Sequence, residues 1–184
     1  MATIAEAEIR VYRRSARAYI DTVTGGTILL TGGCGFLGQY LMQYLLDAFP
    51  DAQIRIIDLV ANPYARIDFS AESRVRTRLG VDICNLASIQ DACLGVDVVV
   101  NLASLISVSI REDSLLAKVN VLATRNVLAA ARTGGADLFI QVSSVAALGY
   151  NNDPLNPVDE AFEFDGSIAR KKLILHSLQV PSRR

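Results

Sequence analysis

Apolar residues along the chain follow two different spacings, and segments of the two kinds alternate. Short uninterrupted runs, such as ILL at 28–30 and VVV at 98–100, are typical of strands that are buried on both faces of a sheet. Residues 37–48 instead carry their apolar side chains at helical spacing, and Pro50 ends that segment. The alternation predicts a parallel sheet whose strands are connected by helices.

The complete pattern gives the order strand, helix, strand, strand, helix, strand, helix, strand. After a first strand at the start of GTILLTGGCGFLG (26–38), the predicted segments are helix 37–48, strand 53–59, strand 78–83, helix 86–94, strand 96–104, helix 112–132 and strand 137–144. This order predicts an α/β fold with a Rossmann-like, doubly wound parallel sheet.

A further helix is predicted before the first strand, over residues 3–20. The apolar residues on one side of it are Ile9, Tyr12, Ala16 and Tyr19. The sequence Thr24-Gly25-Gly26 that follows is typical of a loop. We therefore predict an N-terminal helical extension at 1–24 and one α/β domain at 25–184.

Charge and cysteine content narrow the possible partners. The net charge of −1 gives the chain no general attraction to nucleic acid or to acidic membranes. Cys34, Cys84 and Cys93 lack the spacing of metal ligands and are expected to be buried in a reducing compartment. No apolar run reaches the roughly 18 residues of a membrane span, and the N-terminus lacks the apolar core of a signal peptide. These features predict a cytoplasmic protein without a metal site, a nucleic-acid partner or an integral membrane segment.

Glycines gather at the turn between the first strand and the first helix, in TGGCGFLG at 31–38. Gly32 and Gly35 would let the backbone turn tightly and approach a pyrophosphate. Gly38 would let the helix pack close to the sheet. A glycine turn alone is weak evidence, but its position between a strand and a helix predicts a dinucleotide site.

Two features beside the turn support this prediction. The helix N-terminus, at Phe36 and Leu37, would present free N–H groups to the anion. Asp58 lies 20 residues past Gly38 at the end of the second predicted strand. Its carboxylate would accept hydrogen bonds from a ribose diol and repel a 2′-phosphate, which favours NAD over NADP. A strand-end aspartate that only caps a turn is the alternative.

Several segments together resemble one known protein superfamily. TGGCGFLG, IRIIDL, NLASLISV, KVNVLATRNVLAAA and QVSSVAALG occur in order within residues 27–149. As a set they resemble the extended short-chain dehydrogenase/reductase superfamily, and most closely the 3β-hydroxysteroid dehydrogenase/isomerase family. The resemblance implies an NAD-dependent oxidoreductase that oxidises a secondary alcohol on a sterol-like or other bulky substrate.

The resemblance also implies further cofactor contacts. Asp82 and Ile83, after the third strand, would meet the adenine, and the alternative for Asp82 is a residue that caps a helix or a turn. The residues that would pass beneath the cofactor at the end of the fourth strand are Asn101, Leu102, Ala103 and Ser104. Asn120 occupies the position of a structural asparagine near the active site, although an isolated asparagine could equally be a surface residue.

Catalysis in this superfamily uses a serine together with a tyrosine and a lysine spaced Y-x-x-x-K on one helix. Ser144, at the end of the last predicted strand, fits the serine. In FDGSIARKKLIL, Phe164 takes the tyrosine position and Ile168 the lysine position, and neither side chain can take part in proton transfer. No Y-x-x-x-K occurs in the chain. Tyr150 and His176 are the substitutes considered, with a loop tyrosine packed against the sheet as the alternative for Tyr150.

The resemblance further implies that relatives continue with more strands and a substrate-binding region, so we expect this chain to be truncated and its sheet incomplete at the C-terminal side. The exposed edge would make the chain aggregate or form a homo-oligomer. Three functions stay open. They are a 3β-hydroxysteroid dehydrogenase that is truncated or inactive in this form, a catalytically silent NAD-binding sensor or partner module, and a sugar-nucleotide epimerase or dehydratase relative. The substrate is accordingly sterol-like or a nucleotide-sugar.

Overall fold

The computed structural model describes residues 25–61, 67–106 and 113–144. These residues contain one five-stranded parallel sheet with the strand order β3-β2-β1-β4-β5. The strands are β1 (Thr27–Thr31), β2 (Gln53–Ile57), β3 (Val75–Arg78), β4 (Val98–Asn101) and β5 (Leu138–Gln141). The predicted N-terminal helix at 3–20 and every prediction from residue 145 onward lie outside the described residues.

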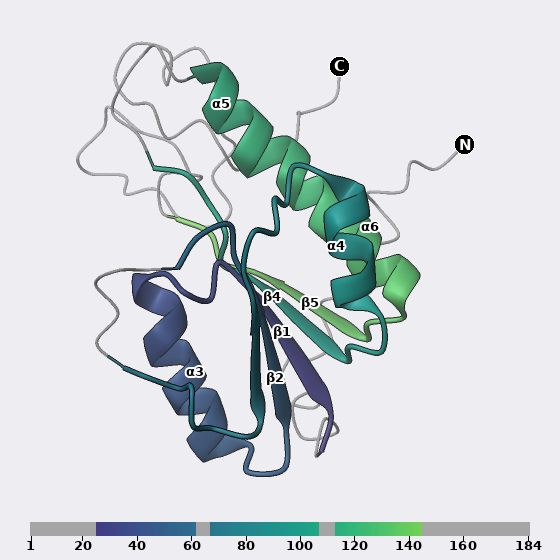
Figure 1. Cartoon of the computed structure of the whole chain (residues 1–184). Coiled ribbons are helices and arrows are strands. Elements are labelled where there is room, and N and C mark those ends of the chain that lie inside the picture. Colours follow the sequence, from purple (N-terminus) through teal and green to yellow (C-terminus); the bar gives the residue numbers. More distant parts are fainter. Residues whose placement is uncertain (1–24, 62–66, 107–112, 145–184) are drawn as a thin grey trace, which may run out of the picture.

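Helices cover both faces of the sheet (Figure 1). On one face lies α3 (Phe36–Ala48), and on the other lie α4 (Leu86–Cys93) and α6 (Ala123–Gly134). α6 continues directly from α5 (Asp113–Ala117) and a π-helical turn, η2 (Lys118–Leu122). The predicted doubly wound parallel sheet is confirmed.

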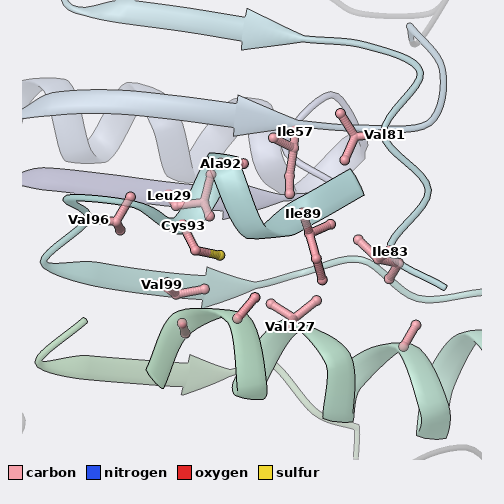
Figure 2. Close-up of a cluster of buried hydrophobic side chains, with 13 residues drawn as sticks. Leu29, Ile57, Val81, Ile83, Ile89, Ala92, Cys93, Val96, Val99 and Val127 are labelled. Atoms are coloured by element: carbon pink, nitrogen blue, oxygen red, sulfur yellow. The ribbon is translucent and has the colours of Figure 1, made fainter. Parts of the chain in front are cut away.

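Alternate residues of each strand enter two separate cores, because successive side chains of a strand point to opposite faces. Leu29 and Val99 pack with α4 and α6, whereas Leu30 and Val100 belong to the core beneath α3. Figure 2 shows the first of these cores, with Ile89 of α4 among the side chains that meet the strands. Coverage of both faces explains why the strands carry uninterrupted apolar runs.

The prediction of the third strand at 78–83 is wrong in position. β3 comprises Val75–Arg78 and pairs in parallel with β2. Gly80 has a φ of +74° and turns the chain away from the sheet just after the strand. Val81 and Ile83, which gave 78–83 its strand-like alternation, are buried beyond the end of the strand in the core that contains α4. β3 is an edge strand with mostly exposed polar residues, so no hydrophobic pattern marked it.

The predicted helix at 112–132 corresponds to the continuous segment from α5 to α6, but the π-helical turn within it was not predicted. The turn Lys118–Leu122 carries i→i+5 geometry, which widens the helix locally and is frequent at functional sites. Asn120 lies in this turn and is 2% exposed. Among the helices of the described ranges, none is long and apolar enough to cross a membrane.

Candidate functional site

Three strands end together at one edge of the sheet. Thr31, Asn101 and Gln141 are the last residues of β1, β4 and β5, and they are neighbours in register. Ligands of open α/β sheets bind outside this carboxyl edge, where the loops leave the strands. Gly32 and Ser144, two of the predicted site residues, lie one and three residues beyond these strand ends.

Glycine is required at two positions, one in the turn after β1 and one in the first turn of α3. Gly32 has a φ of +66°, and its N–H donates to the carbonyl of Ile57 at 2.9 Å. A Cβ on Gly32 would lie 2.8 Å from the Cα of Ala103, and a Cβ on Gly38 would lie 2.3 Å from the carbonyl oxygen of Gly33. Both distances are far shorter than ordinary van der Waals contact. Gly38 packs against the backbone of Gly33 in the turn, and Gly32 packs against the loop after β4; neither contact was predicted.

The N-terminus of α3 is open at this edge. Gly35 is its N-cap residue, provides no side-chain cap, and donates its N–H to the carbonyl of Gly32 at 3.0 Å. The next two residues, Phe36 and Leu37, are 75% and 51% exposed. A helix start that lacks a side-chain cap presents backbone N–H groups and the positive end of the helix dipole to an anion.

The Asp58 carboxylate is held against the glycine turn. Its Oδ2 accepts a hydrogen bond from the N–H of Cys34 at 3.0 Å, and its Oδ1 accepts one from the N–H of Val60 at 3.4 Å. A carboxylate has about four acceptor sites, so it can still receive two hydroxyl donors. Partial burial, and secondarily the neighbouring Asp58 charge, raise the pKa of the Cys34 thiol above its usual value.

Asp82 and Ile83 form part of a local turn after β3. The Asp82 Oδ1 accepts from the N–H of Cys84 at 2.8 Å, as in the turn-capping alternative. The Ile83 side chain is 7% exposed and belongs to the core. The amide of Asn126 in α6 donates to the carbonyls of Ile83 and Cys84 at 3.3 and 3.0 Å. The position of this turn is therefore fixed by α6, and the Ile83 side chain lies in the core.

Asn120 holds the loop that follows β4. Its Oδ1 accepts from the N–H of Leu105 at 2.7 Å, and its Nδ2 donates to the carbonyl of Leu105 at 2.8 Å. These two bonds connect the π-helical turn to the loop. The predicted structural asparagine is thus a loop clamp in this structure, not a surface residue. Leu102 and Ala103 are half-buried in the same loop, and Ser104 is exposed.

A row of polar side chains crosses the sheet below the loops, and its connections were not predicted. The Thr31 hydroxyl donates to the Asn101 Oδ1 and accepts from the N–H of Ala103 at 3.2 Å. The Asn101 Nδ2 donates to the Gln141 Oε1 at 2.7 Å and to the Thr124 hydroxyl at 3.4 Å. Thr31 and Asn101 are both fully buried. We call Thr31, Asn101 and Gln141 the polar row.

Ser144 lies on the carboxyl edge with an exposed side chain, three residues past β5. The strand end before it is anchored, because the N–H of Val142 donates to the carbonyl of Asn101 at 3.1 Å. The expected tyrosine and lysine positions, Phe164 and Ile168, and the substitutes Tyr150 and His176 lie outside the described residues. In the part of the chain that the structure describes, no group of acidic, histidine and cysteine side chains could hold a metal ion.

A cavity of about 390 Å³ borders the glycine turn from the α3 side of the sheet. Its walls include Gly33 and Cys34 of the turn, Met42 of α3, Ile56 of β2 and Phe69 of the segment before β3. The polar row lies on the opposite face, with α4 and α6, so this cavity and the polar row are separate features.

The strand order, the glycine turn after β1 and the carboxylate after β2 define a Rossmann-type α/β protein. Comparison with known families is more specific. The model of the 3-beta hydroxysteroid dehydrogenase/isomerase family matches residues 29–170, and the chain belongs to this family. The resemblance inferred from the sequence motifs is confirmed.

Curated relatives carry the same family name. The 3 beta-hydroxysteroid dehydrogenase/Delta 5→4-isomerases of monkeypox virus and of vaccinia virus (strain Western Reserve) are each 32% identical over 123 residues. Each alignment covers 66% of this chain but only 35% of the relative. The chain thus spans about a third of the length of the curated relatives it matches.

Similar solved structures belong to the same superfamily of folds. ADP-L-glycero-D-manno-heptose-6-epimerase of Helicobacter pylori is 28% identical, with a TM-score of 0.60, over 78% of this chain and 47% of its own. The dTDP-glucose 4,6-dehydratase of Streptomyces venezuelae, solved with NAD bound, is 28% identical with a TM-score of 0.55. The match covers 61% of this chain and 38% of the dehydratase chain. An Agrobacterium tumefaciens short-chain dehydrogenase/reductase superfamily protein with bound NAD is 25% identical with a TM-score of 0.59. The match covers 74% of this chain and 38% of that protein's chain.

Proposed function

We propose that the described part of this chain is the NAD(H)-binding half of an oxidoreductase of the 3β-hydroxysteroid dehydrogenase type. The observation that carries the proposal is the hydrogen bond from the Cys34 N–H to the Asp58 carboxylate, which places a carboxylate beside an open glycine turn. The two NAD-bound structures cited above support the choice of cofactor.

The residues present fit such a cofactor. The pyrophosphate would lie at the turn of Gly32 and Gly35, against the N-terminus of α3, because that helix start has no side-chain cap. The adenosine ribose would meet Asp58, whose negative charge would disfavour a 2′-phosphate. By family position, the adenine would meet the turn at Asp82, which α6 holds in place through Asn126.

The remaining cofactor positions follow the loop after β4. The nicotinamide half would extend over Asn101–Ser104, which the polar row and Asn120 support from below. Bound NAD would supply the hydride acceptor for the oxidation of a secondary alcohol. Ser144 would hold the substrate hydroxyl on the exposed side of the carboxyl edge.

The chain itself is proposed to bind NAD(H) without turnover. Family chemistry requires a phenol that can lose its proton and a lysine that favours this loss, and the sequence has Phe164 and Ile168 at those positions. Incubation of the chain with NAD and a 3β-hydroxysteroid should give no NADH absorbance. Measurable NADH formation would contradict this part of the proposal.

The cofactor proposal is tested by titrating the chain with NADH and NADPH and following nucleotide fluorescence. We expect the chain to bind NADH more tightly than NADPH. Asp58→Asn should weaken NADH binding by about tenfold, since hydrogen bonds to a charged group contribute about 1.5–3 kcal/mol. It should also reduce the difference between the affinities for NADH and NADPH. Asp91→Asn, which changes an exposed aspartate of α4, is the matched control. Equal affinity of the unaltered chain for both nucleotides would refute the assigned role of Asp58.

For the substrate, we propose a sterol-like secondary alcohol, on the strength of the family match and the poxvirus relatives. A nucleotide-sugar is the second candidate, supported by the structural similarity to an epimerase and a sugar-nucleotide dehydratase. The two are separated by equilibrium dialysis of the NADH-bound chain against a radiolabelled 3β-hydroxysteroid and a radiolabelled UDP-sugar. Retention of the UDP-sugar alone would overturn the sterol assignment.

A further inference from the structure

The polar row has one hydrogen-bonding direction only. The Thr124 hydroxyl gives its single proton to the carbonyl of Asn120, so Asn101 turns its Nδ2 toward Thr124 and its Oδ1 toward the Thr31 hydroxyl. The Thr31 hydroxyl donates to this Oδ1 and accepts from the N–H of Ala103. The Asn101 Nδ2 must then face Gln141 and Thr124. The Gln141 Oε1 accepts from Asn101, which leaves its Nε2 to donate to the carbonyl of Val142 at 2.8 Å.

The two side-chain links of this series, from Thr31 to Asn101 and from Asn101 to Gln141, join residues that are distant in sequence. Thr31 is the last residue of β1, directly before the glycine turn, and Asn101 is 70 residues away. Gln141 is a further 40 residues along the chain and lies three residues before Ser144. The series therefore connects the loop that would carry the cofactor with the strand end that carries the exposed serine.

We propose that Gln141 is a positioning residue that couples cofactor binding at the glycine turn to the position of Ser144. The proposal rests on the NAD(H)-binding function inferred above. Gln141 is suited to this role because its one amide group bonds to Asn101 and to the backbone of Val142. Val142 also donates its N–H to the carbonyl of Asn101, so the strand end is held at two points by the same neighbour.

A second branch leaves the polar row at Thr124. Its hydroxyl accepts from the Asn101 Nδ2 at 3.4 Å and donates to the carbonyl of Asn120 at 2.8 Å. The bond from Asn101 to Gln141, at 2.7 Å, is much shorter than the bond to Thr124. We therefore assign the stronger connection to Gln141, and the branch through Thr124 provides an internal comparison.

Amide hydrogen exchange of the 184-residue chain, measured by mass spectrometry with and without NADH, tests the proposal. NADH should slow exchange in peptides covering 31–38, where it would bind, and also in peptides covering 138–144. The second effect should be about fivefold or more, as expected when one buried hydrogen bond is strengthened or lost. If Gln141 had a purely structural role, the NADH effect at 138–144 would persist in a Gln141 variant.

The variant Gln141→Met keeps the side-chain length and removes both hydrogen bonds. It should retain the NADH effect at 31–38 and lose the effect at 138–144. Gln141→Glu keeps the oxygen that accepts from Asn101 and should recover part of the effect. Thr124→Val, which removes only the second branch, should leave the effect at 138–144 unchanged, as should Gln90→Met at an exposed position of α4.

The possible results are distinguishable. Protection at 31–38 without protection at 138–144 in the unaltered chain would overturn the coupling and leave NADH binding intact. Persistence of the effect at 138–144 in Gln141→Met, or its loss in Thr124→Val, would also overturn the assignment to Gln141. Absence of any NADH effect in the unaltered chain would refute both the proposed function and the coupling. If Gln141→Met does not fold, the unaltered chain with and without NADH still tests the coupling, and loss of the effect in Thr124→Val would still overturn the assignment to Gln141.

Discussion

Replacement of Gly32 by alanine tests the close contact between the glycine turn and the loop after β4. Gly32 has a φ of +66°, and a Cβ there would lie 2.8 Å from the Cα of Ala103. Gly95 provides a matched control, because its φ is +61° and a Cβ there would meet nothing within 4 Å. It precedes β4 and therefore lies at the opposite edge of the sheet from the glycine turn. The two substitutions share the backbone strain and differ in the steric overlap.

The expected magnitudes follow from this difference. An alanine in the left-handed region costs about 1–2 kcal/mol, which both variants should show. Overlap with the Ala103 backbone requires a backbone shift, and such overpacking typically costs about 1–3 kcal/mol more. Gly32→Ala should therefore lower the free energy of unfolding by about 1–3 kcal/mol more than Gly95→Ala.

Urea unfolding at 25 °C, followed by circular dichroism, measures both values, with an unchanged slope confirming that the compared states are the same. NADH titration of the two variants adds a functional comparison, in which only Gly32→Ala should weaken binding. Equal unfolding free energies for Gly32→Ala and Gly95→Ala would refute the argument that the contact with Ala103 demands glycine.

Further predictions concern the core and the loop clamp. Burial raises the pKa of the Cys93 thiol to about 11 from 9.0. The unfolded chain therefore loses this proton first as the pH rises, so the stabilising contribution is complete below pH 9 and is lost between pH 9 and about 11. The unfolding free energy should fall over this range, and the fall should be smaller in Cys93→Ala. Val127→Ala, at a fully buried position, should cost about 2 kcal/mol in urea unfolding, and Leu122→Ala, at a largely exposed one, well under 1 kcal/mol. Asn120→Leu should lower the free energy of unfolding by about 1–3 kcal/mol, because both backbone groups of Leu105 lose their hydrogen-bond partner. The same variant should accelerate hydrogen exchange of the Leu105 amide. An unchanged exchange rate would contradict the role of Asn120 in holding the loop.

The sequence was sufficient to predict the elements that are covered on both faces. Uninterrupted apolar runs marked β1 and β4, and the glycine turn marked the start of α3. β3 was predicted at the wrong position because an edge strand needs no apolar run. Val81 and Ile83 gave a strand-like apolar pattern just after the strand has ended. The π-helical turn could not be predicted, because its residues keep ordinary helical periodicity.

Within the candidate site, local chemistry was predictable and long-range contacts were not. The position of Asp58 relative to Gly38 was evident from spacing, whereas the contact of Gly32 with Ala103 joins separate strands and depends on the sheet order. One signal for the polar row was present in the sequence. Thr31 and Asn101 each end an apolar run with a polar residue, and parallel strands in register bring such ends together.

The single bonding direction of the polar row has a consequence for how this protein can diverge. Exchange of Asn101 for an apolar residue would leave the Thr31 hydroxyl without its acceptor and the Gln141 oxygen without its donor. A substitution at one of these three positions therefore destabilises the protein unless a second substitution at another of them restores the hydrogen bonds. Homologous chains should show these positions substituted jointly, as a correlated set inherited together, and seldom one at a time.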